Sequence, residues 1–141
     1  MKTRVSIFVL LVTASLLAGC QSPKPAALTN DQVIQDVNQF LQAASAGDYQ
    51  GAISNFSDTM KSVYSESQFN QLRDLLQSAS GNYNYCSNEK PSLLNSQGYA
   101  VYHLTCKFEK EDVAVTITFK IGGSEIEGLY FSSVGLLKQS K

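Results

Sequence analysis

The 141-residue sequence contains no tryptophan, three prolines and a single histidine, His103. One imidazole leaves few side chains from which a histidine-based catalytic centre or metal site could be built. Charged residues make up only 16% of the chain, and 11 basic residues nearly balance 12 acidic ones. Nucleic-acid-binding domains normally have a basic face, so we expect no nucleic-acid partner. Hydrophobic residues reach 43%, which is enough for one folded domain.

The sequence has one long apolar run, and it lies at the N-terminus. Lys2 and Arg4 precede a mostly apolar stretch that ends at Leu17. A helix of that length would be about 20 Å long, shorter than the roughly 30 Å hydrocarbon core of a bilayer. A positive start followed by a short apolar stretch is typical of a secretory signal peptide, which we assign to residues 1–19.

A cysteine follows two small residues at the end of this run, in Leu17-Ala18-Gly19-Cys20. In this setting the tetrapeptide resembles the lipobox of bacterial lipoproteins. The resemblance implies cleavage before Cys20 and attachment of diacylglycerol to its sulfur. The alternative is a plain secretory signal with a chance cysteine, but such a signal prefers a small residue where Leu17 stands.

The predicted location is the cell membrane or the outer membrane, with the protein lipid-anchored and facing the periplasm or the cell exterior. In Gram-negative lipoproteins an Asp after the cysteine tends to retain the protein at the inner membrane, and here that residue is Gln21. Residues 20–28 would form the lipidated cysteine and a tether, in which Pro23 and Pro25 favour extended backbone. Eight residues reach at most about 28 Å. We therefore expect the single domain, residues 29–141, to lie close to the membrane.

The first half of this domain has the apolar spacing of helices. Thr29 with Gln32, and Ser65 with Gln68, form capping-box patterns that each predict the start of a long helix. The predicted long helices cover 30–46 and 66–80, and shorter helical segments fall around 49–56 and 60–64.

From about residue 81 apolar residues alternate, which indicates strands. The predicted strands cover 83–94, 99–108, 113–121 and 126–130, joined by turns at 95–97, 110–111 and 122–123. The expected cross-strand pairs are Phe108–Val113, Leu104–Ile117, Tyr102–Phe119, Phe119–Ile126 and Val115–Tyr130. One sheet face then collects nearly all the large apolar residues, and the helices would cover it. The predicted fold class is α+β, with N-terminal helices packed on a curved antiparallel meander sheet of about four strands.

Two cysteines, Cys86 and Cys106, are left once Cys20 is assigned to lipid. Exported proteins meet an oxidising compartment, so we expect a disulfide rather than two independent buried thiols. A turn centred near Ser96 would place the two cysteines opposite each other, which suits a bridge. The first strand would need a bulge to bring Cys86 to the core face, and Pro91 indicates an edge strand.

Three helices followed by a curved antiparallel sheet resemble the nuclear-transport-factor-2-like, or cystatin-like, superfamily, and in particular an extracytoplasmic branch of unassigned function. The segments that carry this likeness are Ala46–Tyr49, Phe56–Lys61, Phe69–Leu76, Gly81–Tyr83, Cys106–Lys110 and Gly128–Phe131. The resemblance implies a cone in which a bent sheet wraps a helix and leaves a pocket. Members include small-molecule isomerases and dehydratases, ligand binders, and modules that dimerise through the outer sheet face. Catalytic members often carry an Asp or an Asp–His pair in the pocket, and the predicted register places neither there.

The expected function is therefore a non-catalytic domain that binds a small apolar ligand or an envelope protein. The best candidates to line a pocket are Tyr102, Phe119 and Tyr130, because the hydroxyl of a tyrosine would bring polarity into an apolar cavity. The alternatives are a structural homodimer and an isomerase-like or dehydratase-like enzyme. The predicted dimer face consists of Tyr99, Val101, Leu129 and Phe131, which would otherwise be exposed on the outer sheet face.

We predict no metal site and no cofactor. His103 falls on the outer sheet face, away from any pocket, and is expected to be an ordinary surface imidazole. The acidic run of Glu109, Glu111 and Asp112 is typical of a solvated turn rather than of a set of metal ligands.

Overall fold

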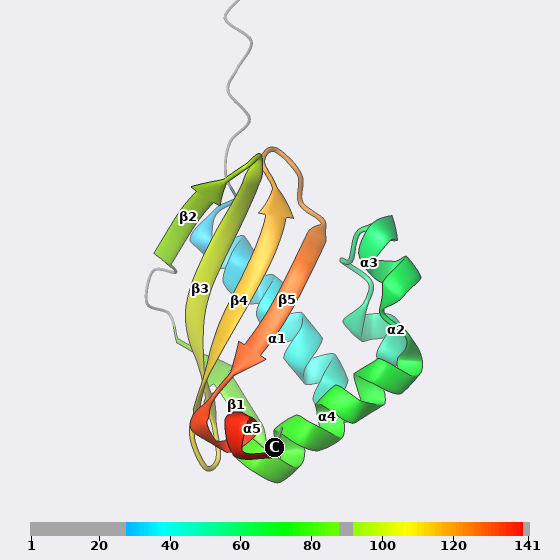
Figure 1. Ribbon diagram of the computed structural model, residues 1–141, viewed down its shortest axis with the longest axis vertical. Coiled ribbons are helices and arrows are strands. Elements are labelled where there is room, and N and C mark those ends of the chain that lie inside the picture. The colour runs from blue at the N-terminus through cyan, green and yellow to red at the C-terminus, as the bar shows by residue number, and fades with distance from the viewer. Residues whose placement is uncertain (1–27, 88–91, 140–141) are drawn as a thin grey trace, which may run out of the picture.

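The computed structural model describes residues 28–87 and 92–139. The predicted signal peptide, Cys20, the tether up to residue 27 and Pro91 lie outside the described residues. The described chain has the predicted α+β fold, in which helices cover one face of an antiparallel sheet (Figure 1).

Helices form the first half of the domain, and a further short helix ends it. They are α1 (Asn30–Ala46), α2 (Tyr49–Ala52), α3 (Asp58–Val63), α4 (Glu66–Ser80) and α5 (Val134–Gln139). Both predicted capping boxes are present, since Thr29 exchanges hydrogen bonds with Gln32 at the start of α1 and Ser65 does so with Gln68 at α4. Helix α1 ends at Gly47, whose φ of 71° is the left-handed conformation that glycine adopts without strain.

The second half of the domain forms the sheet. Its strands are β1 (Tyr83–Cys86), β2 (Ser92–Ser96), β3 (Tyr99–Phe108), β4 (Asp112–Lys120) and β5 (Ile126–Ser132). The order is β1-β3-β4-β5, and β2 also pairs with β3. Thus β1 and β2 share one edge of a meander four strands wide, where the sequence predicted one continuous strand over 83–94.

The bulge predicted in the first strand is confirmed, between Tyr83 and Tyr85. It turns Tyr83 toward the helices, leaves Tyr85 exposed, and brings Cys86 opposite Cys106 as predicted. The turn before β3 lies at Gln97-Gly98, slightly later than predicted, because both residues adopt positive φ.

The expected pairing of β3 with β4 is wrong by two residues. Tyr102 pairs with Ile117 rather than Phe119, and the turn lies at 109–110 instead of 110–111. The backbone oxygen of Glu111 accepts a hydrogen bond from Phe108 N at 3.1 Å, so Glu111 belongs to the β4 side of the turn. Because the displacement is even, every side chain keeps its predicted face.

The expected pairing of β4 with β5 is right at one end only. Phe119 pairs with Ile126 as predicted, but Val115 pairs with Phe131 instead of Tyr130. The register shifts at Thr118–Phe119, where Glu127 is the extra residue on β5. Such a bulge reverses the faces of all later residues in the strand. The predicted two-residue turn at 122–123 is instead a longer connection, 121–125.

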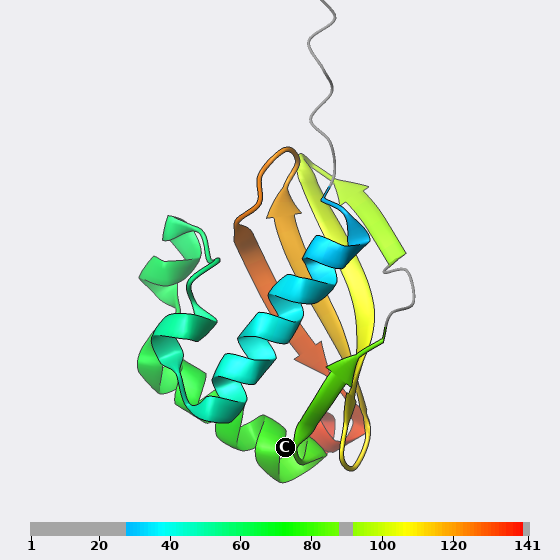
Figure 2. The same cartoon turned by 180° about the vertical axis from the view of Figure 1, so that it is seen from behind.

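The core fills the space between the helices and the inner sheet face. Helix α1 crosses that face obliquely, which Figure 2 shows from the helix side. The ring of Phe40 on α1 lies at the centre, with ring centroids of Phe56, Phe69 and Phe131 5.9, 6.4 and 5.7 Å away. Fully burying side chains of this size stabilises the fold by about 1.5–3 kcal/mol each, so this aromatic cluster fixes the helices on the sheet.

Candidate functional site

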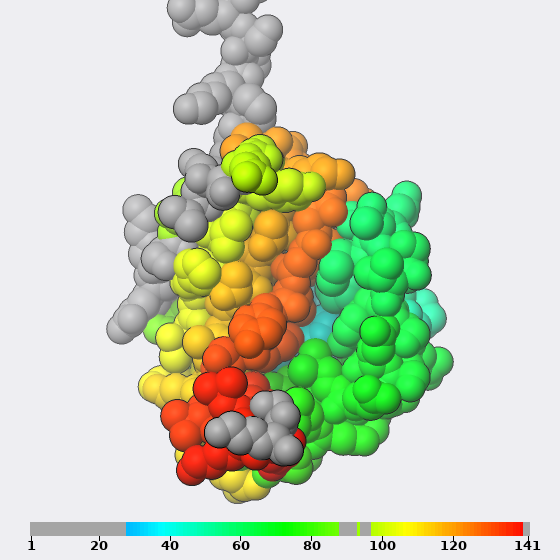
Figure 3. Space-filling view, in the orientation of Figure 1, coloured from blue at the N-terminus to red at the C-terminus, as the bar shows by residue number. Residues whose placement is uncertain are grey.

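An apolar crevice lies between β5 and the helical segments α3 and α4. It has a volume of about 50 Å³. Its lining consists of Phe40, Phe56, Met60, Tyr64, Leu72, Leu129 and Phe131. The space-filling view shows the molecule hollowed between β5 and the helices, with atoms of α1 visible at the bottom (Figure 3). A water molecule needs roughly 10–15 Å³, so the crevice has room for a few water molecules or a small chemical group.

The β5 wall of the crevice results from the bulge at Glu127. This extra residue turns Leu129 and Phe131 toward the helices, where they lie half-buried and buried respectively. The carboxylate of Glu127 is itself held, because Ser57 Oγ donates to it at 3.1 Å and Lys120 Nζ lies 3.0 Å away. The bulge therefore both shapes the wall and fastens it to neighbouring elements.

The opposite wall of the crevice, at the start of α3, is hydrogen-bonded to the start of β5. Ile126 N donates to Asn55 O at 2.8 Å, and Ser57 N donates to Ile126 O at 3.0 Å. The Ser57 side chain also caps α3 by accepting from Met60 N. The start of α3 is thus tied to the start of β5, while Met60 and Tyr64 face the crevice.

Tyr64 is the lining residue that carries a hydroxyl. Its hydroxyl is buried and has no hydrogen-bond partner among the described residues. Burial, reinforced by the nearby Tyr49, raises the pKa of Tyr64 to about 12. The hydroxyl of Tyr49, unlike that of Tyr64, has a hydrogen-bond partner: it donates to the backbone oxygen of Tyr64 at 2.6 Å. A buried hydroxyl without a partner costs about 1–3 kcal/mol, so a ligand that hydrogen-bonds to it would recover that cost.

The pocket predicted from sequence is wrong in its residues. Tyr102 and Phe119 are buried core residues that pack against each other, with ring centroids 6.0 Å apart. The Tyr102 hydroxyl donates to the backbone oxygen of Leu28. Tyr130 lies on the outer face and is 62% exposed, because the bulge at Glu127 reverses the end of β5.

The same reversal corrects the predicted dimer face. Tyr99 is exposed and Val101 half-buried on the outer face, as predicted, but Leu129 and Phe131 line the crevice. Tyr130 takes their place on the outer face. There it pairs with Thr116, which in turn pairs with His103. His103 is exposed, and its Nδ1 lies 2.9 Å from Thr116 Oγ1.

A second, polar crevice lies where α1 approaches the β4–β5 connection. Its lining consists of Leu28, Gln32, Gln35, Asp36, Gln39, Asn55 and Ser124. Burial raises the pKa of the Asp36 carboxyl, partly offset by Asn55 Nδ2, which donates to it at 2.8 Å. This crevice is separate from the apolar one between the sheet and the helices, whose described lining contains no carboxylate.

Among residues 28–87 and 92–139 there is no group of three His, Cys, Asp or Glu side chains that could hold a metal ion, and the acidic residues of the β3–β4 turn make other contacts. Glu109 accepts from Asn82, and Asp112 pairs with Lys107. The Glu111 carboxylate accepts from Ser80 Oγ at 2.8 Å, Ser133 Oγ at 2.6 Å and Gly135 N at 3.0 Å. Led by Ser133, these hydrogen bonds lower the pKa of Glu111. Its role is to hold α5 against the end of α4.

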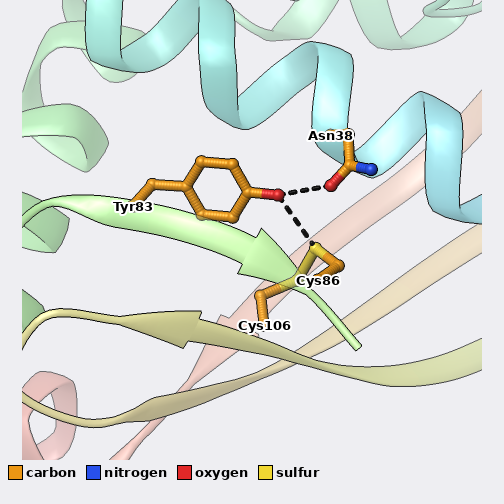
Figure 4. The surroundings of a disulfide bond; sticks show 4 residues. All are labelled: Asn38, Tyr83, Cys86 and Cys106. Atoms are coloured by element: carbon orange, nitrogen blue, oxygen red, sulfur yellow. Dashed lines mark hydrogen bonds between the residues drawn. A yellow bond between two sulfur atoms is a disulfide. The ribbon is translucent and has the colours of Figure 1, made fainter. Parts of the chain in front are cut away.

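The predicted disulfide between Cys86 and Cys106 is present, with an S–S distance of 2.04 Å. Both residues are buried. Figure 4 shows Tyr83 beside the bridge, with its hydroxyl donating to Asn38 Oδ1 on α1 and lying 3.5 Å from Cys86 Sγ. The bridge joins β1 to β3, and the hydrogen bond of Tyr83 fastens this edge of the sheet to α1.

The crevice residues were missed because helical spacing identifies buried residues but not which of them border a gap. One signal was available in the sequence. Ile126, Leu129 and Phe131 break strict alternation, since three positions separate the first two and two positions the next. That break is the mark of a bulge.

Residues 37–129 match a protein family described as protein of unknown function (DUF3887). The match extends from within α1 to Leu129, and so includes most of the crevice lining. The chain belongs to this family. No curated protein matches it. Among the described residues, no helix is both long and apolar enough to cross a membrane.

Proposed function

We propose that this DUF3887 protein is a lipid-anchored, non-catalytic binding domain of the cell envelope, whose apolar crevice takes one end of a small amphiphilic ligand. Anchoring at Cys20 is supported by the lipobox-like Leu17–Cys20 segment after a short apolar run. The helix-on-sheet layout is consistent with the resemblance to the nuclear-transport-factor-2-like superfamily, in which such a gap serves ligand binding.

One observation carries the ligand proposal, namely the partnerless hydroxyl of Tyr64 in an apolar crevice. Pockets for small ligands are mostly apolar with a few placed polar groups that fix orientation. Here the apolar walls of Leu129 and Phe131 would receive a hydrocarbon or ring. The Tyr64 hydroxyl would donate to an oxygen of the same ligand.

Native mass spectrometry of the full lipoprotein, extracted gently from its own membrane, tests this proposal. We expect a co-purifying small molecule that is lost on denaturation and is depleted in Tyr64→Phe. Tyr130→Phe is the matched control, because Tyr130 is exposed on the other face of the same sheet. Equal occupancy in both variants, or no small molecule in the wild-type protein, would contradict ligand binding in the crevice.

A structural homodimer is a second candidate, favoured by the composition of the outer sheet face. Side by side on adjacent strands lie His103, Thr116 and Tyr130, and next to them Val101, Thr118 and Gly128. Acidic and lysine side chains are absent from both rows, so a second copy could cover this face without burying such charges. Val101→Glu combined with Tyr130→Glu should then convert a dimer into a monomer, and an unchanged mass by light scattering would exclude this face.

An isomerase-like or dehydratase-like activity is the third candidate, and it depends on Asp36. A carboxyl with a raised pKa in a crevice is a candidate general acid or base. However, Asn55 already occupies one Asp36 oxygen, and the described lining contains no histidine to act with it. Turnover that is abolished in Asp36→Asn would favour this candidate over a purely binding role.

A further inference from the structure

Two turns of the sheet meet the start of the described chain at one end of the domain. We call this end the rim and define it as Gln97–Tyr99 together with Ile121–Ser124. Ile121 N donates to Gly98 O at 2.9 Å, which joins the two turns. Close behind the rim, the Tyr102 hydroxyl donates to Leu28 O at 3.1 Å. The point where the tether enters the domain is therefore fixed beside the rim.

The surface of the rim suits a lipid interface. Tyr99 and Ile121 are large, partly apolar side chains that are each 37% exposed. Tyrosine concentrates at the headgroup level of membranes, because its ring is apolar and its hydroxyl can remain hydrated. Lys120, directly behind the rim, is paired with Glu127 at 3.0 Å. The rim as defined contains no charged residue, and the exposed Glu125 follows it directly in the same connection.

Exposed apolar residues alone do not select this end. At the opposite end of the sheet, α5 exposes Val134 at 67% and Leu137 at 56%. The tether decides between the two ends. Strand β3 runs from the rim toward the far end and spans about 30 Å, whereas the eight residues from Gln21 to Leu28, two of them proline, would span about 25 Å in a polyproline conformation. A lipid on Cys20 would thus hold the rim near the bilayer and keep α5 away from it.

We propose that the rim rests on the lipid surface, with Tyr99 and Ile121 at the headgroup level and the strands of the sheet directed away from the membrane. This inference rests on the lipid anchor of the proposed function, but not on any ligand in the crevice. It adds an orientation and a lipid contact made by the folded domain itself.

The absence of tryptophan makes the test direct, because each variant then carries a single tryptophan as the reporter. Ile121→Trp and Tyr99→Trp place the reporter on the rim, and Val134→Trp places it at the far end as the matched control. The full lipidated protein is reconstituted into phosphatidylcholine vesicles, with and without brominated acyl chains. We expect blue-shifted emission and quenching by brominated lipid for both rim reporters, and neither for Val134→Trp.

Flotation of the same samples distinguishes a failure of the rim contact from a failure of the lipid anchor. Protein that floats with the vesicles but shows equal, weak quenching at all three positions would overturn the rim contact and leave the anchor standing. Stronger quenching at Val134→Trp than at the rim would reverse the proposed orientation. Failure to float would refute the anchor, and the rim proposal would fall with it.

Discussion

A half-buried tyrosine lies near each edge of the sheet, and the hydroxyls of the two tyrosines differ in their hydrogen bonding. At the β1 edge the Tyr83 hydroxyl donates to Asn38 and lies beside the Cys86–Cys106 bridge. At the β5 edge the Tyr64 hydroxyl is buried without a partner among the described residues. Burial raises the pKa of both phenols, yet only Tyr83 gains a hydrogen bond in exchange.

The contrast separates an edge that contributes stability from the edge where we propose that a ligand binds. The β1 edge is closed by a covalent bond and by a satisfied polar group. The β5 edge is closed by apolar contacts around a crevice of about 50 Å³. A site that retains an unsatisfied donor gives up stability that a ligand can restore, and the β1 edge offers no such opportunity.

The largest expected effect on the unfolding free energy comes from removing the disulfide at the β1 edge. The double variant Cys86→Ala/Cys106→Ala should unfold with a free energy lower by about 3 kcal/mol, because the bridge closes a loop in the unfolded chain. The sequence separation of 20 residues sets the size of that loop. Denaturant unfolding followed by circular dichroism measures the difference.

Thiol labelling provides the control for this prediction. Because Cys86 and Cys106 are 3% and 0% exposed, the bridge should resist reducing agents until the domain unfolds. Quantitative labelling of both cysteines in denatured but unreduced protein would show that the bridge does not form. An unchanged unfolding free energy in the double variant would show that it does not stabilise the β1 edge.

The next largest effect is expected for Glu111, which connects the chain just before β1 with the chain just after β5. Its carboxylate holds Ser80 at the end of α4, and Ser133 and Gly135 at the start of α5. We expect Glu111→Gln to lower the unfolding free energy by about 1–2 kcal/mol, because charge-assisted hydrogen bonds are lost. Chemical unfolding at neutral pH measures this loss.

Acid titration sharpens the Glu111 prediction. Since its pKa is lowered in the folded protein, its stabilisation is present above the unfolded value of 4.5 and is lost as the pH falls through the lower folded value. The wild-type protein should therefore lose more stability in acid than Glu111→Gln does. Asp36→Asn is the matched control: its pKa shifts upward, so its removal should not diminish the acid loss.

The elements could be predicted from sequence more reliably than the way they meet. Local hydrogen-bonding patterns decide where helices begin, which is why both capping boxes lie where Thr29 and Ser65 indicated. The pairing of Cys86 with Cys106 could also be predicted, because these two cysteines remain once Cys20 is assigned to lipid. This argument does not depend on the alternation of apolar residues in the strands. Alternation predicted the faces of β3 and β4 correctly even though the pairing was off by two residues.

The candidate site could not be predicted from the alternation of apolar residues, which indicates neither a bulge nor a contact between distant segments. Because Glu127 is an extra residue in β5, Leu129 and Phe131 lie on the inner face and Tyr130 lies on the outer face. Two residues predicted for the dimer face therefore line the crevice, and one residue predicted for the pocket lies on the outer face. The gap beside Tyr64 arises from how α3 is tied to β5 through Ser57, a contact between residues 70 positions apart. Helix α5 was missed for the same reason, since Glu111 holds it from a distant turn.

A smaller effect is expected for Tyr83→Phe, which tests the closed edge alone. Removing the hydroxyl takes away its hydrogen bond to Asn38 and leaves the amide of Asn38 partly buried. The expected loss is about 1 kcal/mol in unfolding free energy. If Tyr83→Phe is as stable as the wild-type protein, the hydrogen bond does not stabilise the β1 edge.

The smallest effect on stability, and the most informative, is expected for Tyr64→Phe. Because the deleted hydroxyl is buried without a described partner, its loss should leave the ligand-free domain unchanged or stabilise it by up to about 1 kcal/mol. The variant should also keep stability at high pH. Burial raises the folded pKa of Tyr64 to about 12 from an unfolded value near 10, so the wild-type protein loses stability as the pH rises from about 10 toward 12, whereas Tyr64→Phe has no phenol to ionise there. Chemical unfolding at pH 7 and pH 11, with Tyr83→Phe measured alongside, checks both points. A loss for Tyr64→Phe equal to that of Tyr83→Phe would mean that the Tyr64 hydroxyl is satisfied after all, and the two edges of the sheet would no longer differ in kind.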